Sequence, residues 1–107
     1  MKLEITSTAI MHLSEISAYY ANNVTKDKAR EVILGITDNL NILKEFPMLG
    51  RAIPYVEGYR GHLCYKNYIA IYKLENNIIY VYGIFNCKQD YTSILKNLLS
   101  KTKKTEY

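Results

Sequence analysis

Residues 59–85 read YRGHLCYKNYIAIYKLENNIIYVYGIF, and two sets of side chains, one more polar than the other, alternate over part of this length. A repeat of two residues is typical of a β-strand whose two faces meet different surroundings. Asn67 and the run Glu75-Asn76-Asn77 interrupt the pattern with residues that favour tight turns. The stretch therefore predicts an antiparallel meander of three strands, Tyr59–Lys66, Tyr68–Leu74 and Ile78–Phe85.

Two helical patterns precede the meander. Apolar residues recur at helical spacing from Ala9 to Tyr20, after Ser7 as the expected N-cap. Thr25 is expected to cap a second helix, whose apolar stripe runs from Ala29 to Phe46. Because only Asn22-Asn23 and a few neighbours separate them, the two helices should form an antiparallel hairpin.

Shorter elements lie on either side. Lys2 to Thr6 alternates as a short strand does, and the apolar residues from Tyr91 to Leu99 have the spacing of an amphipathic helix. The segment from Pro47 to Glu57 is rich in turn-forming residues and is expected to be a loop. We therefore predict an α+β fold of order β-α-α-β-β-β-α, with the helix hairpin packed on one face of a small twisted antiparallel sheet.

Length and composition fit one globular domain. The chain has 107 residues, of which 49% are hydrophobic and 22% are charged. We expect residues 1–100 to form a single domain and residues 101–107 a Lys-rich tail. No apolar run is long enough for a membrane span, and the start has no signal-peptide pattern. Cys64 and Cys87 lack disulfide-framework or metal-site spacing. We expect a cytoplasmic protein with no membrane partner and two structural cysteines.

The positive charge is concentrated in the second half of the chain. Residues 1–50 carry five basic and six acidic side chains, whereas residues 51–107 carry nine basic and four acidic ones. The second half also holds most of the eleven tyrosines. This asymmetry favours a polyanionic partner, either a nucleic acid or an acidic protein segment.

Arg60 and His62 are the strongest candidates for chemistry. They share one face of the first meander strand, roughly 7 Å apart by strand rise, and we expect that face, with Lys66, to be open. Such a pair could hold a phosphate and supply a general acid or base, or it could be two exposed residues without a task. Arg51 could bind a ligand or cap the preceding helix, and Lys88 and Asp90 could bind or form surface ion pairs. His12 lies between core positions and is expected to be structural.

The sequence contains no metal-binding or phosphate-loop motif and no paired carboxylates spaced for hydrolysis. We therefore predict neither a metal site nor a cofactor. RNA cleavage would suit the side chains that remain, since the RNA supplies its own nucleophile, the 2′-hydroxyl. The protein then needs only to orient and deprotonate this hydroxyl and to stabilise the negative charge that develops.

Several motifs resemble the RelE/ParE superfamily of bacterial type II toxins over nearly the whole chain. They are the helix pattern of Ser7, Ala9, Leu13, Ile16, Tyr19 and Tyr20, then Phe46-Pro47-x-Leu49-Gly50-Arg51, Tyr59-Arg60, Asn67 to Lys73 and Phe85 to Tyr91. The resemblance implies a growth-inhibiting toxin that a small, acidic cognate antitoxin neutralises. RelE-like members cut mRNA on the ribosome with basic side chains and a tyrosine, whereas ParE-like members inhibit DNA gyrase.

The resemblance places Arg60 and His62 on two basic positions of the cutting set, with Tyr91 as the candidate tyrosine. Ile69 and Gln89 occupy two further positions that are arginine in RelE-like members, and the loss of two charges favours the ParE-like branch. The candidate target-binding residues are then Arg51, Lys66, Lys73, Lys88 and Asp90. The alternatives are a ribosome-dependent, metal-independent mRNA endonuclease, if Lys66, Lys73 or Lys88 replaces the lost charges, and an inactive module that binds only the antitoxin.

Overall fold

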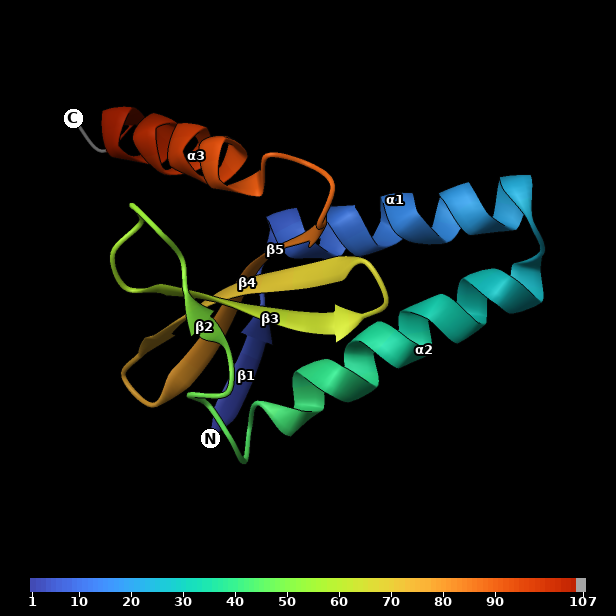
Figure 1. Cartoon of the computed structure of the whole chain (residues 1–107), viewed down its shortest axis with the longest axis horizontal. Coiled ribbons are helices and arrows are strands. Elements are labelled where there is room, and N and C mark those ends of the chain that lie inside the picture. The colour runs from blue at the N-terminus through green and yellow to red at the C-terminus, as the bar shows by residue number, and fades with distance from the viewer. Residues whose placement is uncertain (106–107) are drawn as a thin grey trace.

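The computed structural model describes the backbone of residues 1–105 and the side chains of residues 1–97, 99 and 100. Its elements follow the order β1 (Lys2–Ile5), α1 (Ser7–Asn23), α2 (Lys26–Ile42), β2 (Arg51–Ala52), β3 (Tyr59–Tyr65), β4 (Tyr68–Glu75), β5 (Ile78–Asn86) and α3 (Tyr91–Thr105). The α+β class and the helix hairpin are as predicted. Figure 1 shows α1 and α2 extending past the sheet on one side and α3 on the other.

The sheet has five strands in the order β1-β5-β4-β3-β2. The meander β3-β4-β5 is antiparallel, as expected, and Asn76 and Asn77 make its second turn with φ of 53° and 62°. Such left-handed angles match the tight turns that join twisted strands. However, β1 pairs in parallel with β5, so the sheet is mixed. The expected loop also contains β2, whose two residues pair with Arg60 and Gly61.

Local signals set the helix ends, with two differences from the prediction. Thr6, not Ser7, caps α1, because the Thr6 hydroxyl accepts the N–H of Ala9. Thr25 caps α2 as expected. The second helix ends at Ile42, and tighter i→i+3 bonds follow it, such as Leu43 N–H to Leu40 O. The apolar stripe therefore stops at the buried Leu43, and Phe46 is 58% exposed.

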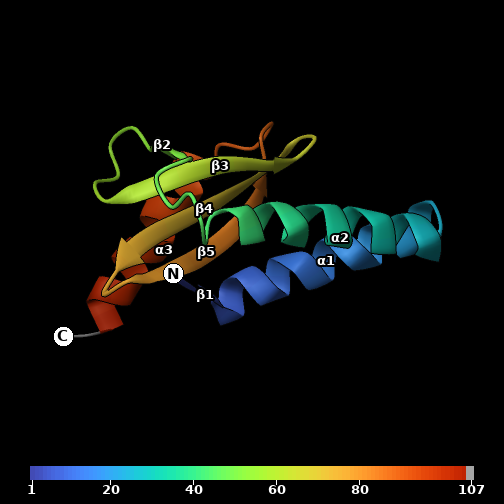
Figure 2. The same cartoon turned by 90° about the horizontal axis from the view of Figure 1, so that it is seen from below.

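Two apolar clusters lie on the two faces of the sheet. The helix hairpin packs Val32, Ile36 and Leu40 against strand residues that include Tyr72 and Val81. On the other face, Leu95 of α3 packs against Ile71 and Phe85. Seen from below, in Figure 2, the strands separate the hairpin from most of α3. Both faces of the sheet are thus covered in part.

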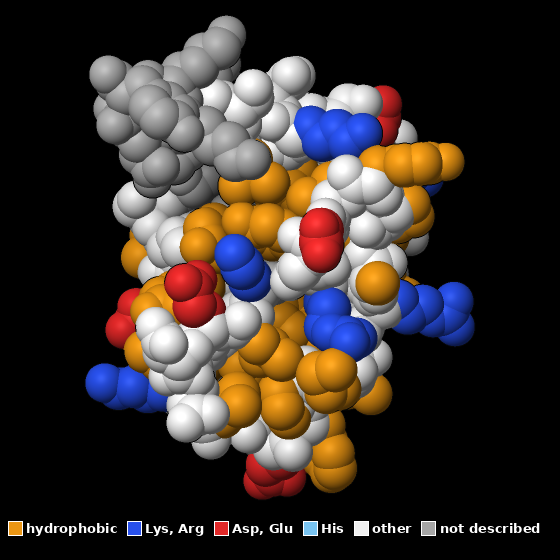
Figure 3. All heavy atoms as spheres, turned by 90° about the vertical axis from the view of Figure 1, so that its left-hand side faces the viewer, with side chains coloured by type: hydrophobic (Ala, Val, Ile, Leu, Met, Phe, Trp, Pro, Cys, Tyr) orange, Lys and Arg blue, Asp and Glu red, His pale blue; other side chains and the backbone are white. Residues whose placement is uncertain are grey.

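The side of the molecule that carries the β2–β3 loop is shown in Figure 3, where apolar side chains interleave with charged ones. Tyr55 in that loop is 88% exposed, and the Lys96 Nζ atom lies 5.1 Å from the centre of its ring. A cation over an exposed aromatic ring stabilises the pair only modestly.

Candidate functional site

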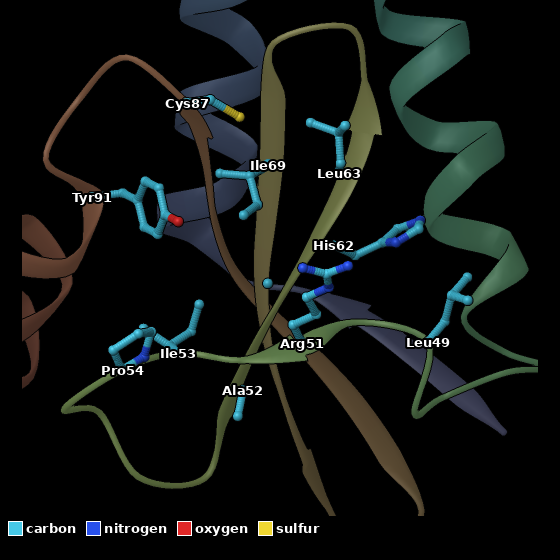
Figure 4. A pocket seen from close by; sticks show the side chains of 11 residues that line it. Leu49, Arg51, Ala52, Ile53, Pro54, His62, Leu63, Ile69, Cys87 and Tyr91 are labelled. Carbon is cyan, nitrogen blue, oxygen red and sulfur yellow. The ribbon is translucent and has the colours of Figure 1, made fainter.

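A pocket of about 650 Å³ opens at the edge of the sheet where β2 ends. Within the described residues, β2 pairs with β3 only at Arg60 and Gly61, so the remainder of β3 runs on as an open edge. Figure 4 shows the side chains around this opening. The lining residues are Leu49, Arg51, Ala52, Ile53, Pro54, Gly61, His62, Leu63, Ile69, Cys87 and Tyr91.

Three of the residues predicted from the sequence meet in this pocket. Arg51 comes from β2, His62 from β3 and Tyr91 from the first turn of α3. In Figure 4 the Tyr91 hydroxyl points inward from the α3 side, while Arg51 lies on the side toward α2. Arg51 and Tyr91, 40 positions apart in the chain, thus share one opening, because β2 and the start of α3 flank it.

The wall on the α3 side is apolar, and a glycine makes it possible. A Cβ atom on Gly61 would lie 2.8 Å from Ile69 Cδ1 and 2.9 Å from Ile53 Cδ1. Real Cβ atoms do not come this close to other carbons, so the two isoleucines occupy the space that a side chain would fill. Ile69, one of the positions that departs from the RelE-like pattern, therefore serves as pocket wall.

His62 presents a polar group without a partner. Its ring points toward α2 in Figure 4, and its Nε2 atom is buried with no hydrogen bond among the described residues. Burial lowers the pKa of His62 below its usual value of 6.5, so the ring is neutral at pH 7. An unpaired buried nitrogen is unfavourable for the folded state.

Arg60 does not lie where the sequence reasoning placed it. Its Nη1 atom donates a hydrogen bond of 2.6 Å to the Gly50 carbonyl, and Arg60 is opposite the core residue Tyr72 in the sheet register. Arg60 and His62 therefore lie on the hairpin side of β3, and the expectation of an open face bearing both was wrong. Alternation along β3 puts Tyr59 on the other side, in the cluster that α3 covers.

The three candidate lysines lie apart from the pocket lining. Lys66 is in the β3–β4 turn with its Nζ 5.5 Å from the Tyr65 ring centre. Lys73 lies near the far end of the sheet, over the ring of Tyr59 and 4.0 Å from Glu75. Lys88 is exposed in the β5–α3 turn. The structure therefore does not gather these lysines into one cationic site.

Asp90 caps α3. Its carboxylate accepts the N–H of Ser93 at 3.3 Å and the hydroxyl of Ser93 at 2.8 Å. These bonds hold the pKa of Asp90 below its usual value. The carboxylate thus has a structural partner, and its place beside Tyr91 fixes where the helix begins.

Of the remaining titratable candidates, His12 and Cys64 are structural, whereas Cys87, which was also expected to be structural, is exposed. The Nδ1 atom of His12 accepts the N–H of Ile84 at 3.1 Å, as expected for a core histidine. Cys64 is 1% exposed, and burial raises the pKa of its thiol to about 12. Cys87 is exposed and lines the pocket. Among the described residues, no group of three His, Cys, Asp or Glu side chains is placed to hold a metal ion.

The pocket combines an apolar wall with the guanidinium of Arg51, the imidazole of His62 and the hydroxyl of Tyr91. This arrangement suits an apolar anchor side chain of a protein partner, with a carboxylate near Arg51.

Sequence reasoning identified the polar residues of the pocket lining but missed the apolar ones, such as Pro54 and Leu63. Leu63 lies on β3 next to the buried Cys64 and is 58% exposed. It is exposed because β2 pairs only with Arg60 and Gly61 and does not extend alongside Leu63.

Comparisons with known proteins identify the family. Residues 3–91 match the sequence model described as "ParE toxin of type II toxin-antitoxin system, parDE". The fold is similar to a solved structure titled "Chromosomal ParDE TA system from P. aeruginosa", with a TM-score of 0.72 and 22% sequence identity. That similarity covers 80% of this chain and 95% of the other. No curated protein sequence matches the chain.

None of the described helices is both long and apolar enough to cross a bilayer. The family match spans the first strand, both hairpin helices, the meander and the first residue of α3, so it includes every wall of the pocket. The chain therefore belongs to the ParE toxins of type II toxin-antitoxin systems, whose partner is an antitoxin.

Proposed function

We propose that this toxin acts in the cytoplasm by binding and inhibiting DNA gyrase and does not cleave mRNA. The observation that carries this choice is the state of Arg60. Its half-buried guanidinium is bonded to the Gly50 carbonyl at 2.6 Å, and Arg60 is not among the residues that line the pocket. A nuclease of the RelE-like kind would need that charge at the reacting group.

The other positions of the cutting set support the same choice. Ile69 forms apolar pocket wall, and the Gln89 side chain accepts the backbone N–H of Asn86 at 3.0 Å. Loss of a single charge contact to a transition state costs about 10²–10³ in rate. Ile69 and Gln89 carry no charge, and Arg60 is bonded to the Gly50 carbonyl. Binding to gyrase is therefore better supported than cleavage of mRNA.

The test is inhibition of gyrase by the purified protein. Gyrase supercoils relaxed plasmid in the presence of ATP, and we expect the toxin to abolish that activity in a dose-dependent way. Preincubation with the cognate antitoxin should restore it. Arg51→Ala should weaken inhibition about tenfold, since a charged contact contributes about 1.5 kcal/mol. Arg30→Ala is the matched control, because it removes the same charge from an exposed position on α2.

Unchanged supercoiling at all doses would reject gyrase as the target. Primer extension on translated mRNA then separates the alternatives. Codon-positioned cuts that persist in EDTA and disappear in Arg60→Ala would identify an mRNA endonuclease. Normal growth after induction, with antitoxin binding retained, would identify an inactive module.

A further inference from the structure

The loop between α2 and β2, residues 43–50, is held against the sheet by hydrogen bonds to Gly50 and Pro47. The Gly50 N–H donates to the Tyr72 hydroxyl at 2.9 Å, and that hydroxyl donates to the Pro47 carbonyl at 2.7 Å. Arg60 then donates to the Gly50 carbonyl at 2.6 Å. Side chains from β3 and β4 thus satisfy three backbone groups of a segment that has little regular structure of its own.

Only glycine fits at this fastening point. A Cβ atom on Gly50 would lie 2.7 Å from both Cε1 and the hydroxyl oxygen of Tyr72, and 3.0 Å from the Gly61 carbonyl oxygen. Tyr72 is fully buried and packed in the core, so it cannot move aside easily. The loop is therefore held against the sheet at one fixed distance.

The fastened loop presents large apolar side chains to solvent. Phe46, Met48 and Leu49 are 58%, 61% and 51% exposed, and the N–H of Leu49 closes a turn onto the Phe46 carbonyl at 3.1 Å. Exposed apolar groups on a rigid support are typical of binding surfaces, because little conformational entropy is lost on association. Leu49 and Arg51, the two neighbours of Gly50, both line the pocket.

We propose that Arg60 and Tyr72 are positioning residues for partner binding, which fix Gly50 and thereby place Leu49 and Arg51 in the wall of the pocket. Arg60 itself is not among the residues that line the pocket. The inference rests on the proposed function for the identity of the bound protein, gyrase. The structural coupling from Arg60 through Gly50 to the pocket wall does not depend on that identity.

The state of the Tyr72 hydroxyl is consistent with this role. Burial raises the pKa of Tyr72 above 10, and the hydroxyl keeps its proton throughout the physiological range. It can therefore accept from Gly50 and donate to Pro47 at the same time.

The test is a double-mutant cycle on the intact toxin. Arg60→Ala removes the bond to the Gly50 carbonyl, and Gly50→Ala displaces the loop while leaving the Arg60 side chain intact. Affinity for gyrase and the amide NMR signals of Leu49 and Arg51 are measured for both variants and for the double variant. We expect each single change to weaken binding about tenfold and to shift both signals, and the double variant to bind no more weakly than the weaker single variant.

Two further variants keep the test decisive. Arg60→Lys retains the charge and a donor, so it should recover most of the affinity that Arg60→Ala loses. Tyr72→Phe, which removes the hydroxyl alone, should shift the same two amide signals. If Gly50→Ala does not fold, the cycle is run with Tyr72→Phe in its place.

Additive losses in the double variant, or unchanged loop signals in Arg60→Ala, would overturn the inference, because Arg60 would then act without the loop. Failure of the proposed function looks different: the unmodified toxin itself would not bind gyrase. Growth arrest on induction then replaces affinity as the readout, and the NMR comparison remains the same.

Discussion

The two histidines have opposite relations to their surroundings. His12 accepts the N–H of Ile84 and packs edge-on against Phe85, with ring centres 5.0 Å apart. His62 has a buried Nε2 atom without a partner. Burial lowers the pKa of both rings, so both are neutral at pH 7, but only His12 uses its nitrogen within the fold.

Replacing each histidine by phenylalanine should therefore have different effects on stability. His12→Phe leaves the Ile84 N–H unpaired and should lower the free energy of unfolding by about 1–3 kcal/mol. His62→Phe removes an unsatisfied nitrogen and should leave stability unchanged or raise it slightly. Urea denaturation measures both. Equal destabilisation by the two changes would show that His62 has a partner in the folded protein.

Arg60 shows what residue patterns can and cannot predict. Alternation along the strand correctly placed Arg60 and His62 on one face, since that follows from backbone geometry. Which face the helices cover depends on packing between distant elements, and the sequence of one strand does not contain it. Arg51, His62 and Tyr91 were predicted as candidates from the sequence, and all three line one pocket, but their meeting there depends on where β2 ends.

Among the elements, α2 approaches β3 closely because it carries Gly35. A Cβ atom on Gly35 would collide with the ring of Tyr65 on β3. In an exposed helix, alanine is more favourable than glycine by about 1 kcal/mol. Here the collision should dominate, because overpacking a fitted contact costs about 1–3 kcal/mol.

We therefore expect Gly35→Ala to destabilise the protein by about 1–2 kcal/mol in chemical denaturation, against its helix propensity. Adding Tyr65→Ala should recover part of that loss by removing the ring. Asp38→Ala, an exposed change on the same helix, serves as the control and should be neutral or stabilising. A stabilising Gly35→Ala would mean that α2 is free to move away from the sheet.

The start of α3 depends on one carboxylate. Asp90 accepts both the N–H and the hydroxyl of Ser93, and Leu95 one turn further on is buried against the sheet. Asp90→Ala should lower stability by about 1 kcal/mol, whereas Asp90→Asn, which can still cap, should lower it less. Hydrogen exchange at the first turn of α3 should rise in Asp90→Ala. Unchanged exchange there would show that packing of Leu95 alone fixes the helix.

Elements with a strong local period were predictable, and those defined by distant partners were not. The hairpin helices and the meander follow from periods of 3.6 and 2. A two-residue strand such as β2 has no period and exists only because β3 lies beside it. The parallel pairing of β1 with β5 joins segments more than 70 residues apart, a contact that no local pattern encodes.

At the scale of the molecule, the toxin family is established by the match over residues 3–91 and not by an exposed cationic face. The core that supports the fold holds many groups that ionise only at high pH. Burial raises the pKa values of Tyr59, Tyr68, Tyr72 and Tyr82 above their usual value of 10, and that of Cys64 from 9.0 to about 12. The folded protein should therefore be sensitive to alkali.

The thiol of Cys64 is the first of these groups to matter as pH rises. Between pH 9 and 12 the thiol of the unfolded chain loses its proton while the buried thiol of the native protein keeps it. The unfolded state then binds fewer protons, so stability falls with pH by up to about 1.4 kcal/mol per pH unit. Between pH 9 and 10, Cys64→Ala should flatten this fall in urea denaturation, whereas Cys87→Ala, at an exposed position, should retain it. Parallel curves for the two variants would mean that the buried thiol does not determine stability in alkali.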